Sequence, residues 1–421
     1  MVKVAILGLG SRGATTYGDY LITLNDVKIS AICDIDKDKL NFYQNKYHVE
    51  KKDCFLNSED FFKAGKLADI LIIATMDQDH YSQAMKALDL KYHLLLEKPI
   101  ALNLKQCLDI ENKALKNNLY VVVCHVLRYS LFYKKIKEIV NSKILGNIIN
   151  INTTENVGYW HQTHSFVRGN WNNSNKTSPM ILQKCCHDFD ILNWIIDKKP
   201  LNVSSFGSLS LFKKENAPKD SSNYCYDCKI QNNCPYNAVK YYVDSIKNDK
   251  DLGWPYDVVV LNPTKDKVLA AIKNGPYGRC VYKCDNNVVD HQIVNIQYED
   301  NITATHTMCA FSKDCYRDIK IFATRGDLIA NTLNNTIIYH TFVDNKEFVI
   351  DVSKLTNDLS GHMGGDKLMI NELLKLINKE TSQLDSSIEK SVLSHVIAFA
   401  AEKSRINKGV VINLNEFKSI Q

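Results

Sequence analysis

A glycine-rich turn directly follows the first apolar run of the chain and restricts what the N-terminal part can fold into. Residues 2–7, VKVAIL, favour a β-strand, and the sequence GLGSRG follows at once, ahead of a helix-compatible stretch. In this G-x-G-x-x-G pattern Gly8 allows a tight turn, Gly10 lets a pyrophosphate approach the backbone, and Gly13 lets the helix pack on the strand. The pattern predicts a strand–turn–helix unit that binds a dinucleotide.

The residues around this turn indicate which dinucleotide it binds. Ser11 and Arg12 lie at the expected helix N-terminus, where free N–H groups and the positive helix dipole favour phosphate. A second apolar run, residues 27–33, ends at Asp34. This carboxylate can accept hydrogen bonds from ribose hydroxyls and would repel a 2′-phosphate, so we predict NAD rather than NADP. The alternative is a glycine turn that binds nothing.

Strand-like and helix-like segments alternate through the N-terminal part. The predicted strands are 2–7, 27–33, 68–75, 93–96 and 119–124, and helices are expected at 80–88 and 104–117. This alternation is typical of a doubly wound parallel sheet, in which ligands bind beyond the carboxyl ends of the strands. The side chains expected to contact the cofactor at or just after these ends are Thr75, Asp77, His80, Glu97 and Lys98.

The remaining chain has a different pattern of predicted strands and helices. Strands are predicted at 148–154, 203–212, 292–298, 303–310, 318–324 and 336–340, with helices at 133–142, 181–196, 366–378 and 388–407 and a loop over 155–178. We therefore predict an α/β protein: a Rossmann domain over 1–124, then an α+β domain over 125–421 with a mostly antiparallel open sheet. The second domain carries a cysteine-bearing insertion around 213–290.

Composition excludes several classes of protein. Hydrophobic residues make up 45% of the 421 residues and charged residues 24%, as in soluble globular proteins. The net charge of +5 is spread along the chain, which argues against nucleic-acid binding. The sequence shows neither a secretory signal nor an apolar run of about twenty residues, so we predict no membrane span and a cytoplasmic location. Thirteen cysteines are then expected to be thiols or metal ligands.

Two segments carry candidate catalytic groups. Lys98 closes a strand in Glu97-Lys98-Pro99, where it could hold a substrate hydroxyl and favour a developing alkoxide. His187 opens a helix with a pKa range suited to general-base catalysis, and Lys184 lies one turn earlier on the same face. Asp190 could orient the imidazole or bind substrate. The alternatives are an exposed lysine before a turn and a packed core histidine.

An aromatic and polar loop is the candidate substrate site. Aromatic faces together with hydroxyl-binding side chains suit a sugar, and the residues selected are Tyr159, Trp160, His164, Arg168, Asn170 and Trp171. The alternative is a loop packed between domains.

The cysteines of the insertion have a metal-ligand spacing. Cys225 and Cys228 form C-x2-C, Cys234 follows closely, and Cys280 and Cys284 come about fifty residues later. We predict a structural zinc site with Cys280 slightly favoured over Cys284 as the fourth ligand. Free thiols and an iron–sulfur cluster are the alternatives.

At this point the chain resembles the Gfo/Idh/MocA family, the glucose–fructose oxidoreductase and inositol dehydrogenase group, over nearly its whole length. The resemblance rests on GLGSRG at 8–13, CD at 33–34, IIAT with a following His80, EKP at 97–99, LRY at 127–129, LG at 145–146 and HDFD at 187–190. It implies a C-terminal sheet that serves substrate binding and oligomerisation, hence a homodimer or homotetramer. It also implies that Lys98 and His187 are the catalytic pair. Many members carry an Asp four residues before the histidine, where this chain has Gln183.

Together these features predict an NAD-dependent oxidoreductase that transfers a hydride between a secondary alcohol of a sugar or cyclitol and nicotinamide. Three alternatives stay open: a glycosidase that oxidises its substrate transiently, an NAD-binding sugar sensor without catalysis, and an aldose–aldose oxidoreductase that keeps its cofactor bound.

Overall fold

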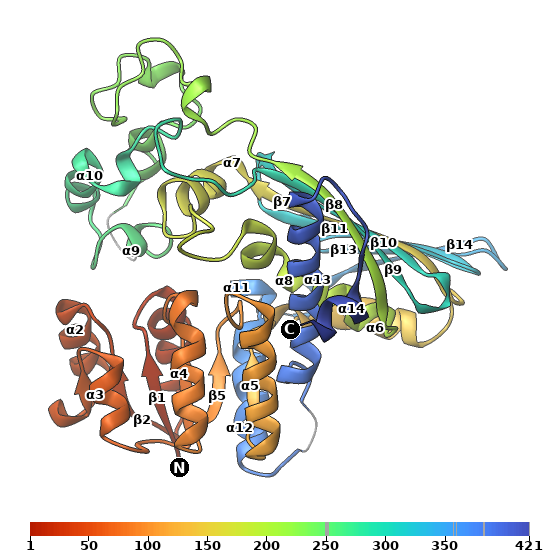
Figure 1. Ribbon diagram of the computed structural model, residues 1–421, viewed down its shortest axis with the longest axis horizontal. Coiled ribbons are helices and arrows are strands. Elements are labelled where there is room, and N and C mark those ends of the chain that lie inside the picture. Colours follow the sequence, from red (N-terminus) through yellow and green to blue (C-terminus); the bar gives the residue numbers. More distant parts are fainter. Residues whose placement is uncertain (249–251, 357, 359, 382–383, 421) are drawn as a thin grey trace.

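The apolar runs of the N-terminal part form a six-stranded parallel sheet (Figure 1). The structure, a computed structural model, describes residues 1–421 except 249–251, 357, 359, 382–383 and 421. Strands in this sheet are ordered β3-β2-β1-β4-β5-β6, and every neighbouring pair is parallel. Their bounds are β1 (Val2–Leu7), β2 (Val27–Cys33), β3 (Cys54–Phe55), β4 (Ile70–Ile73), β5 (His93–Leu96) and β6 (Val121–Val123). The predicted doubly wound sheet is confirmed.

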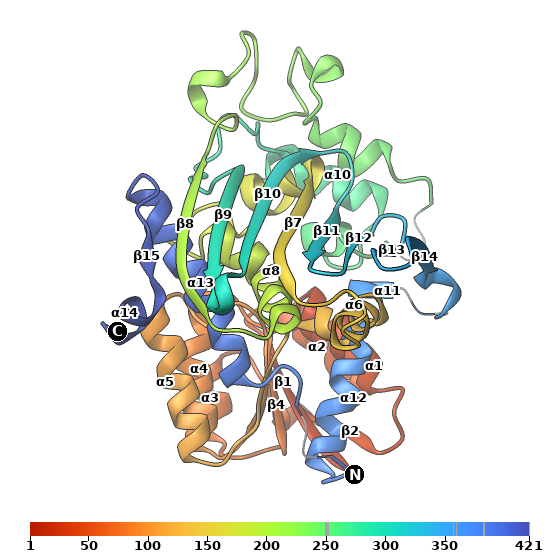
Figure 2. The ribbon, with the colours of Figure 1, turned by 90° about the vertical axis from the view of Figure 1, so that its right-hand side faces the viewer.

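Helices cover both faces of this sheet because its strands are apolar on both sides. One face carries α3 (Ser58–Lys63), α4 (Asp77–Asp89) and α5 (Leu104–Lys116), and the other carries η1 (Ser11–Gly18), α1 (Asp19–Leu21) and α2 (Lys37–Tyr47). A late helix, α12 (Gly365–Ile377), returns to this second face (Figure 2), and its Met369 and Ile370 belong to the same buried cluster as Ile70 and Ile72 of β4. The distant C-terminal part of the chain therefore helps to build the nucleotide-binding fold.

The second sheet has nine strands in the order β14-β13-β12-β11-β7-β10-β9-β8-β15. Only β7 and β10 pair in parallel, and the other neighbours are antiparallel, so the predicted mostly antiparallel sheet is also confirmed. The strands are β7 (Ile148–Gly158), β8 (Pro200–Ser208), β9 (His291–Tyr298), β10 (Thr303–Ser312), β11 (Tyr316–Ala323), β12 (Gly326–Asn331), β13 (Thr336–Thr341), β14 (Lys346–Asp351) and β15 (Ile412–Asn413).

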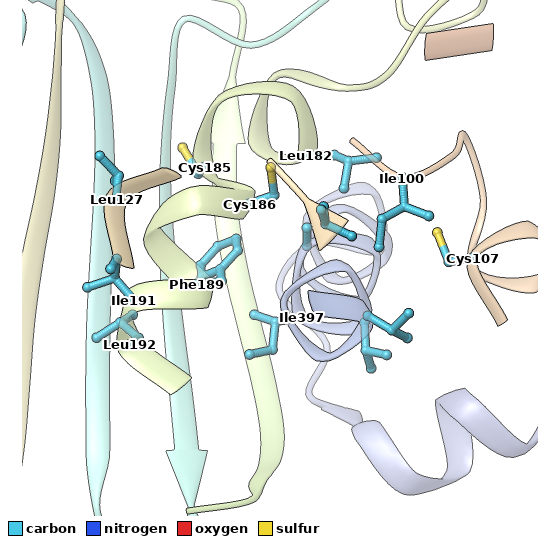
Figure 3. Close-up of a cluster of buried hydrophobic side chains, with 14 of the residues drawn as sticks. Ile100, Cys107, Leu127, Leu182, Cys185, Cys186, Phe189, Ile191, Leu192 and Ile397 are labelled. Carbon is cyan, nitrogen blue, oxygen red and sulfur yellow. The ribbon is translucent and has the colours of Figure 1, made fainter. Parts of the chain in front are cut away.

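Apolar helices pack on one face of the second sheet and join it to the first domain. They are α6 (Leu131–Asn141), α8 (Met180–Ile196) and α13 (Ile388–Ile406), with the short α11 (Ser360–Met363) and α14 (Leu414–Ser419) near the C-terminus. Figure 3 shows Phe189 of α8 and Ile397 of α13 in one buried cluster with Ile100 and Cys107. Because this core is continuous between the domains, α8 is held firmly over the end of the parallel sheet.

The structure differs from the sequence prediction over 155–178. Strand β7 continues to Gly158, and α7 (Tyr159–His161) and η4 (Gln162–Arg168) replace most of the predicted loop. Strand pairing explains the extension, because Glu155 lies opposite Arg317 of β11 and its buried carboxylate receives an ion pair from that side chain. Tertiary contacts thus override the polar character of this segment.

The insertion lies between β8 and β9 and forms a separate small core. It contains η5 (Lys214–Asn216), η6 (Gln231–Asn233), η7 (Lys240–Asp244), α9 (Tyr256–Val259), α10 (Lys265–Asn274) and η8 (Pro276–Gly278). Tyr242, Val268 and Ile272 are buried at its centre, and both ribbon views show it projecting from the second domain (Figures 1 and 2). Within the residues that the structure describes, no helix combines the length and apolar character needed to cross a bilayer.

Candidate active site

The glycine turn after β1 leaves room for a phosphate. Gly8 has φ of +88°, and a Cβ there would lie 2.5 Å from the carbonyl oxygen of Ala74. A Cβ at Gly13 would lie 2.0 Å from the carbonyl oxygen of Gly8, whereas a Cβ at Gly10 would meet nothing within 4 Å. The open space above Gly10 lies at the N-terminus of η1, where Ser11 and Arg12 present their backbone amides. These residues fit the pyrophosphate of a dinucleotide.

The carboxylate of Asp34 is fixed beside this turn. Its Oδ2 accepts a hydrogen bond from the backbone N–H of Leu9 at 2.6 Å, and its Oδ1 accepts one from Asp36 at 2.8 Å. Each oxygen keeps a further lone pair. Asp34 can therefore receive ribose hydroxyls while already held in position.

The side chain of Arg12 turns into the protein. Its Nε lies 2.6 Å from Glu97 Oε1, and its Nη2 lies 2.6 Å from Asp366 Oδ1. Burial raises the pKa of Glu97, but the charges of Arg12 and Lys98 and the hydrogen bonds from Tyr17 and Arg12 together hold that pKa below its usual range. Arg12 thus joins the glycine turn to the end of β5 and to α12.

The other side chains predicted at the strand ends also have protein partners. Thr75 Oγ1 donates to Gln83 Oε1 at 2.7 Å, and His80 Nδ1 lies 2.8 Å from the carbonyl oxygen of Pro99. Asp77 Oδ2 accepts a hydrogen bond from the backbone N–H of Ser178 at 3.0 Å. These contacts shape the edge of the parallel sheet and attach the second domain to it.

Lys98 lies at this edge and reaches the first turn of α8. Its Nζ donates a hydrogen bond to the backbone carbonyl of Gln183 at 2.8 Å. Burial lowers the pKa of Lys98 below its ordinary value, although Cys186 and Glu97 act in the opposite direction. The contact places an ammonium group between the two domains.

His187 lies one helical turn beyond Gln183, on the same face of α8. Its Nδ1 is buried and has no hydrogen-bond partner among the described residues, and the same is true of Gln183 Oε1. Burial holds the pKa of His187 far below 6.5, and the charges of Lys98 and His125 act in the same direction. The imidazole is therefore neutral at pH 7 and can accept a proton.

Lys184 belongs to a buried cluster of charges. Its Nζ lies 3.1 Å from Glu155 Oε1, and Arg317 Nε lies 2.8 Å from Glu155 Oε2 and 2.7 Å from Asp188 Oδ1. Burial lowers the pKa of Lys184, but the charge and hydrogen bond of Glu155 act with Cys315 in the opposite direction, and the net shift is upward. Lys184 stays charged, and its charge is balanced within the protein.

Asp190 faces the interior. Arg128 donates to both of its oxygens, from Nε at 2.5 Å and Nη2 at 2.7 Å, and His125 Nδ1 lies 2.8 Å from its Oδ1. The imidazole centroids of His125 and His187 are 5.7 Å apart. Asp190 thus supports the surroundings of His187 through His125.

The residues of the aromatic segment contact several different parts of the protein. Asn170 Nδ2 lies 3.8 Å from Met76 Sδ at the edge of the first domain, whereas His164 Nδ1 lies 2.6 Å from Tyr242 Oη in the insertion. Trp160 Nε1 donates to the carbonyl of Lys313 at 3.0 Å, and Trp171 packs against the main core. Tyr159 is exposed. Arg168, at the end of η4, donates to the carbonyl of Tyr236 in the insertion. The four cysteines belong to the insertion and line a cavity that neither Lys98 nor His187 lines.

Two histidines missed by the sequence analysis lie near the candidate pair. The ring of His362 is 5.8 Å from that of His187, and its Nδ1 lies 3.1 Å from Asp366 Oδ2. Burial and the charge of Lys184 both lower the pKa of His161. The pattern GHMGGD at 361–366 was the available signal for His362, because it places a histidine and an aspartate four residues apart.

These observations define a class of protein: an NAD-binding oxidoreductase with a Rossmann domain and a second α/β domain. A family model described as "Oxidoreductase family, NAD-binding Rossmann fold" matches residues 2–125, and one described as "Oxidoreductase family, C-terminal alpha/beta domain" matches residues 137–412. The chain belongs to the Gfo/Idh/MocA family of oxidoreductases, as its motifs indicated.

Three similar proteins share between 14% and 24% of their residues with this chain. The protein YteT of Bacillus subtilis is 21% identical over 403 residues, covering 89% of this chain and 88% of YteT. Inositol 2-dehydrogenase of Salmonella typhimurium is 24% identical over 198 residues, covering 47% of this chain and 55% of that enzyme. The crystal structure of an oxidoreductase from Agrobacterium radiobacter in complex with NAD+, L-tartaric acid and magnesium has a TM-score of 0.69 at 14% identity and covers 99% of both chains. At that identity the likeness shows a shared fold.

Proposed function

We propose that this protein transfers a hydride between a secondary alcohol of a sugar or cyclitol and the nicotinamide of NAD. One observation carries the proposal: His187 Nδ1 and Gln183 Oε1 are buried, have no hydrogen-bond partner among the described residues, and lie one turn apart on α8, where the ammonium of Lys98 contacts the Gln183 carbonyl. Buried polar groups are nearly always hydrogen-bonded, so unpartnered ones point to a polar ligand. A substrate with several hydroxyl groups fits this set.

The chemistry divides between two side chains and the cofactor. His187, neutral at pH 7, accepts the proton of the substrate hydroxyl. Lys98 holds the same oxygen and stabilises the negative charge that develops on it. NAD, when bound, supplies the acceptor for the hydride that leaves the carbon. The products are a ketone, NADH and a proton, which His187 returns to solvent.

The choice of a sugar or cyclitol rests on the polar and aromatic residues of 159–171 and on Lys184. Asn170 reaches the edge of the first domain, and Lys184 lies one turn before His187. The name of the Salmonella relative, inositol 2-dehydrogenase, is consistent with a cyclic polyol. For Lys184 we propose an electrostatic role, because its ammonium is already paired with Glu155.

We further propose that copies of the chain associate through the open face of the nine-stranded sheet. Large apolar side chains are exposed along it, including the neighbours Phe206 and Ile293 on β8 and β9, and Ile329 and Val349 farther along. An apolar surface of this kind is typical of a subunit interface. A homodimer or homotetramer would cover it.

The test is to incubate the protein and NAD+ with a panel of free sugars, inositols and aryl glycosides. We expect a free sugar or inositol to give one NADH per molecule of ketone. Cleavage of an aryl glycoside without net NADH would instead identify a glycosidase with transient oxidation, and tight sugar binding without turnover would identify a sensor.

A further inference from the structure

Four cysteines of the insertion surround one small cavity. Cys225 and Cys228 lie in one turn, Cys234 follows η6, and Cys280 follows η8. The cavity has a volume of about 20 Å³, and its other walls are mainly aromatic and aliphatic. A site of this size holds about one water molecule or ion. Its lining residues include all four cysteines and exclude Cys284, whose Sγ donates to the carbonyl oxygen of Cys280 at 3.3 Å.

Backbone hydrogen bonds hold the cysteine segments together although fifty residues separate them. The N–H of Cys225 donates to the carbonyl of Gly278 at 2.8 Å, and the N–H of Cys280 donates to the carbonyl of Asn223 at 2.8 Å. Tyr224 and Arg279 form a β-bridge between the same segments. The convergence of Cys225 and Cys280 is therefore built into the backbone.

Hydrogen-bond donors face the sulfurs. The backbone of Tyr236 donates a hydrogen bond to Cys234, and the backbone of Tyr282 donates one to Cys280, in each case from two residues farther along the chain. Arg168 brings a permanent positive charge, with its Nη2 3.5 Å from Cys225 Sγ. Donors and cations around sulfur are the outer-shell contacts that a thiolate ligand requires.

We propose that Cys225, Cys228, Cys234 and Cys280 bind one zinc ion as four thiolates. Four sulfurs in a small closed site suit tetrahedral zinc and leave no open position for catalysis. No three of these sulfurs lie within 4.8 Å of one another in the described structure, whereas sulfurs around zinc lie about 3.8 Å apart. Metal binding therefore draws the side chains inward around the cavity.

This site has a consequence for the candidate active site. Arg168 ends η4, and its guanidinium also donates to the carbonyls of Arg279 at 2.7 Å and Tyr236 at 2.6 Å. Both carbonyls belong to the segments that carry Cys280 and Cys234. The zinc site thus anchors η4, the segment that leads to Asn170 at the edge of the first domain. The zinc site thereby holds one wall of the substrate site in place, and we call this structural role the clamp.

Metal content of the full-length, untagged protein purified without chelator tests the proposal. We expect about one zinc per chain in the wild type and in the matched control C284S, and less than about a tenth of an equivalent in C280S. Equal zinc in C280S and wild type, or none in the wild type, would overturn the four-cysteine site. Iron with inorganic sulfide would overturn the assignment to zinc.

A second measurement needs only the wild-type protein, in case C280S fails to fold. Zinc is removed by a thiol-reactive mercurial and replaced by Co²⁺ after the thiols are recovered. Tetrahedral Co²⁺ with four thiolates gives sulfur-to-metal charge-transfer bands, which we expect at one equivalent of cobalt. Absorption of six-coordinate, oxygen-bound cobalt alone would contradict the site.

Metal removal should also lower the melting temperature and leave NAD affinity unchanged, and an unchanged melting temperature would contradict the clamp.

Discussion

The ammonium of Lys98 donates a hydrogen bond of 2.8 Å to the backbone carbonyl of Gln183, which joins the end of β5 to the first turn of α8. This contact between two domains brings the lysine to the helix that carries His187. A proton acceptor and a cation thus meet where the nicotinamide of a Rossmann domain is expected. The predictions below test separate parts of this arrangement.

Removing the imidazole of His187 should abolish most of the activity. In His187→Ala we expect turnover to fall about a hundredfold or more, the usual contribution of a positioned general base. NAD affinity should stay the same, because His187 belongs to the second domain. Steady-state kinetics and NAD titration measure both, and His48→Asn at the exposed C-terminal end of α2 is the control. Near-normal turnover in His187→Ala would remove this residue from the mechanism.

The pH dependence of alcohol oxidation should reflect the depressed pKa of His187. The imidazole acts as a base only when neutral, and burial keeps it neutral to well below 6.5. We therefore expect kcat/KM to stay level as the pH falls from about 8 to about 6.5, and to decline only below that range. If kcat/KM has already fallen by half at pH 7, another group limits the reaction or His187 is accessible to water.

Asp34 should determine the preference for NAD over NADP. Its carboxylate is held by Leu9 and Asp36 and would face a 2′-phosphate with like charge. The substitution Asp34→Ser should narrow the difference between the two dissociation constants, mainly by improving NADP binding. Fluorescence titration with both cofactors measures this. NADP binding as tight as NAD binding in the unaltered protein would contradict the prediction.

Asp190 should matter more for stability than for substrate affinity. Asp190→Asn leaves Arg128 buried without its charged partner, which typically costs about 3 kcal/mol or more in free energy of unfolding. The exposed pair of Asp60 and Lys63 is the control, and Asp60→Asn should change stability by less than about 1 kcal/mol. Chemical denaturation compares them. A stable Asp190→Asn variant with a raised KM would instead make Asp190 a substrate ligand.

Sequence patterns predicted those parts of the site that are built from residues close together in the chain. The glycine turn and Asp34 lie within one strand–helix–strand unit, and alternation of segments predicted both sheets. The partners of Arg12 and Asp190 could not be predicted, because Asp366 lies 354 residues from Arg12 and Arg128 lies 62 residues from Asp190. Such contacts depend on how α12 and α8 pack, and one sequence does not reveal that.

The segment after residue 155 shows the same limit. Its polar residues predicted a loop, but pairing with β11 and β10 extended β7 to Gly158. The cysteines of the insertion, in contrast, could be selected from the sequence. The spacing of Cys225, Cys228 and Cys234 indicated a shared site, and the cavity that they line includes Cys280 but not Cys284.

The most direct test of the central claim follows the hydrogen atom itself. The substrate identified in the panel is prepared with deuterium on the carbon that bears the reacting hydroxyl and is incubated with NAD+ and the wild-type protein. Our account predicts that the deuterium appears at C4 of the nicotinamide in the NADH that accumulates, one per ketone formed, and that Lys98→Ala greatly slows this transfer. Substrate conversion with the deuterium retained in the product, and without net NADH, would contradict it.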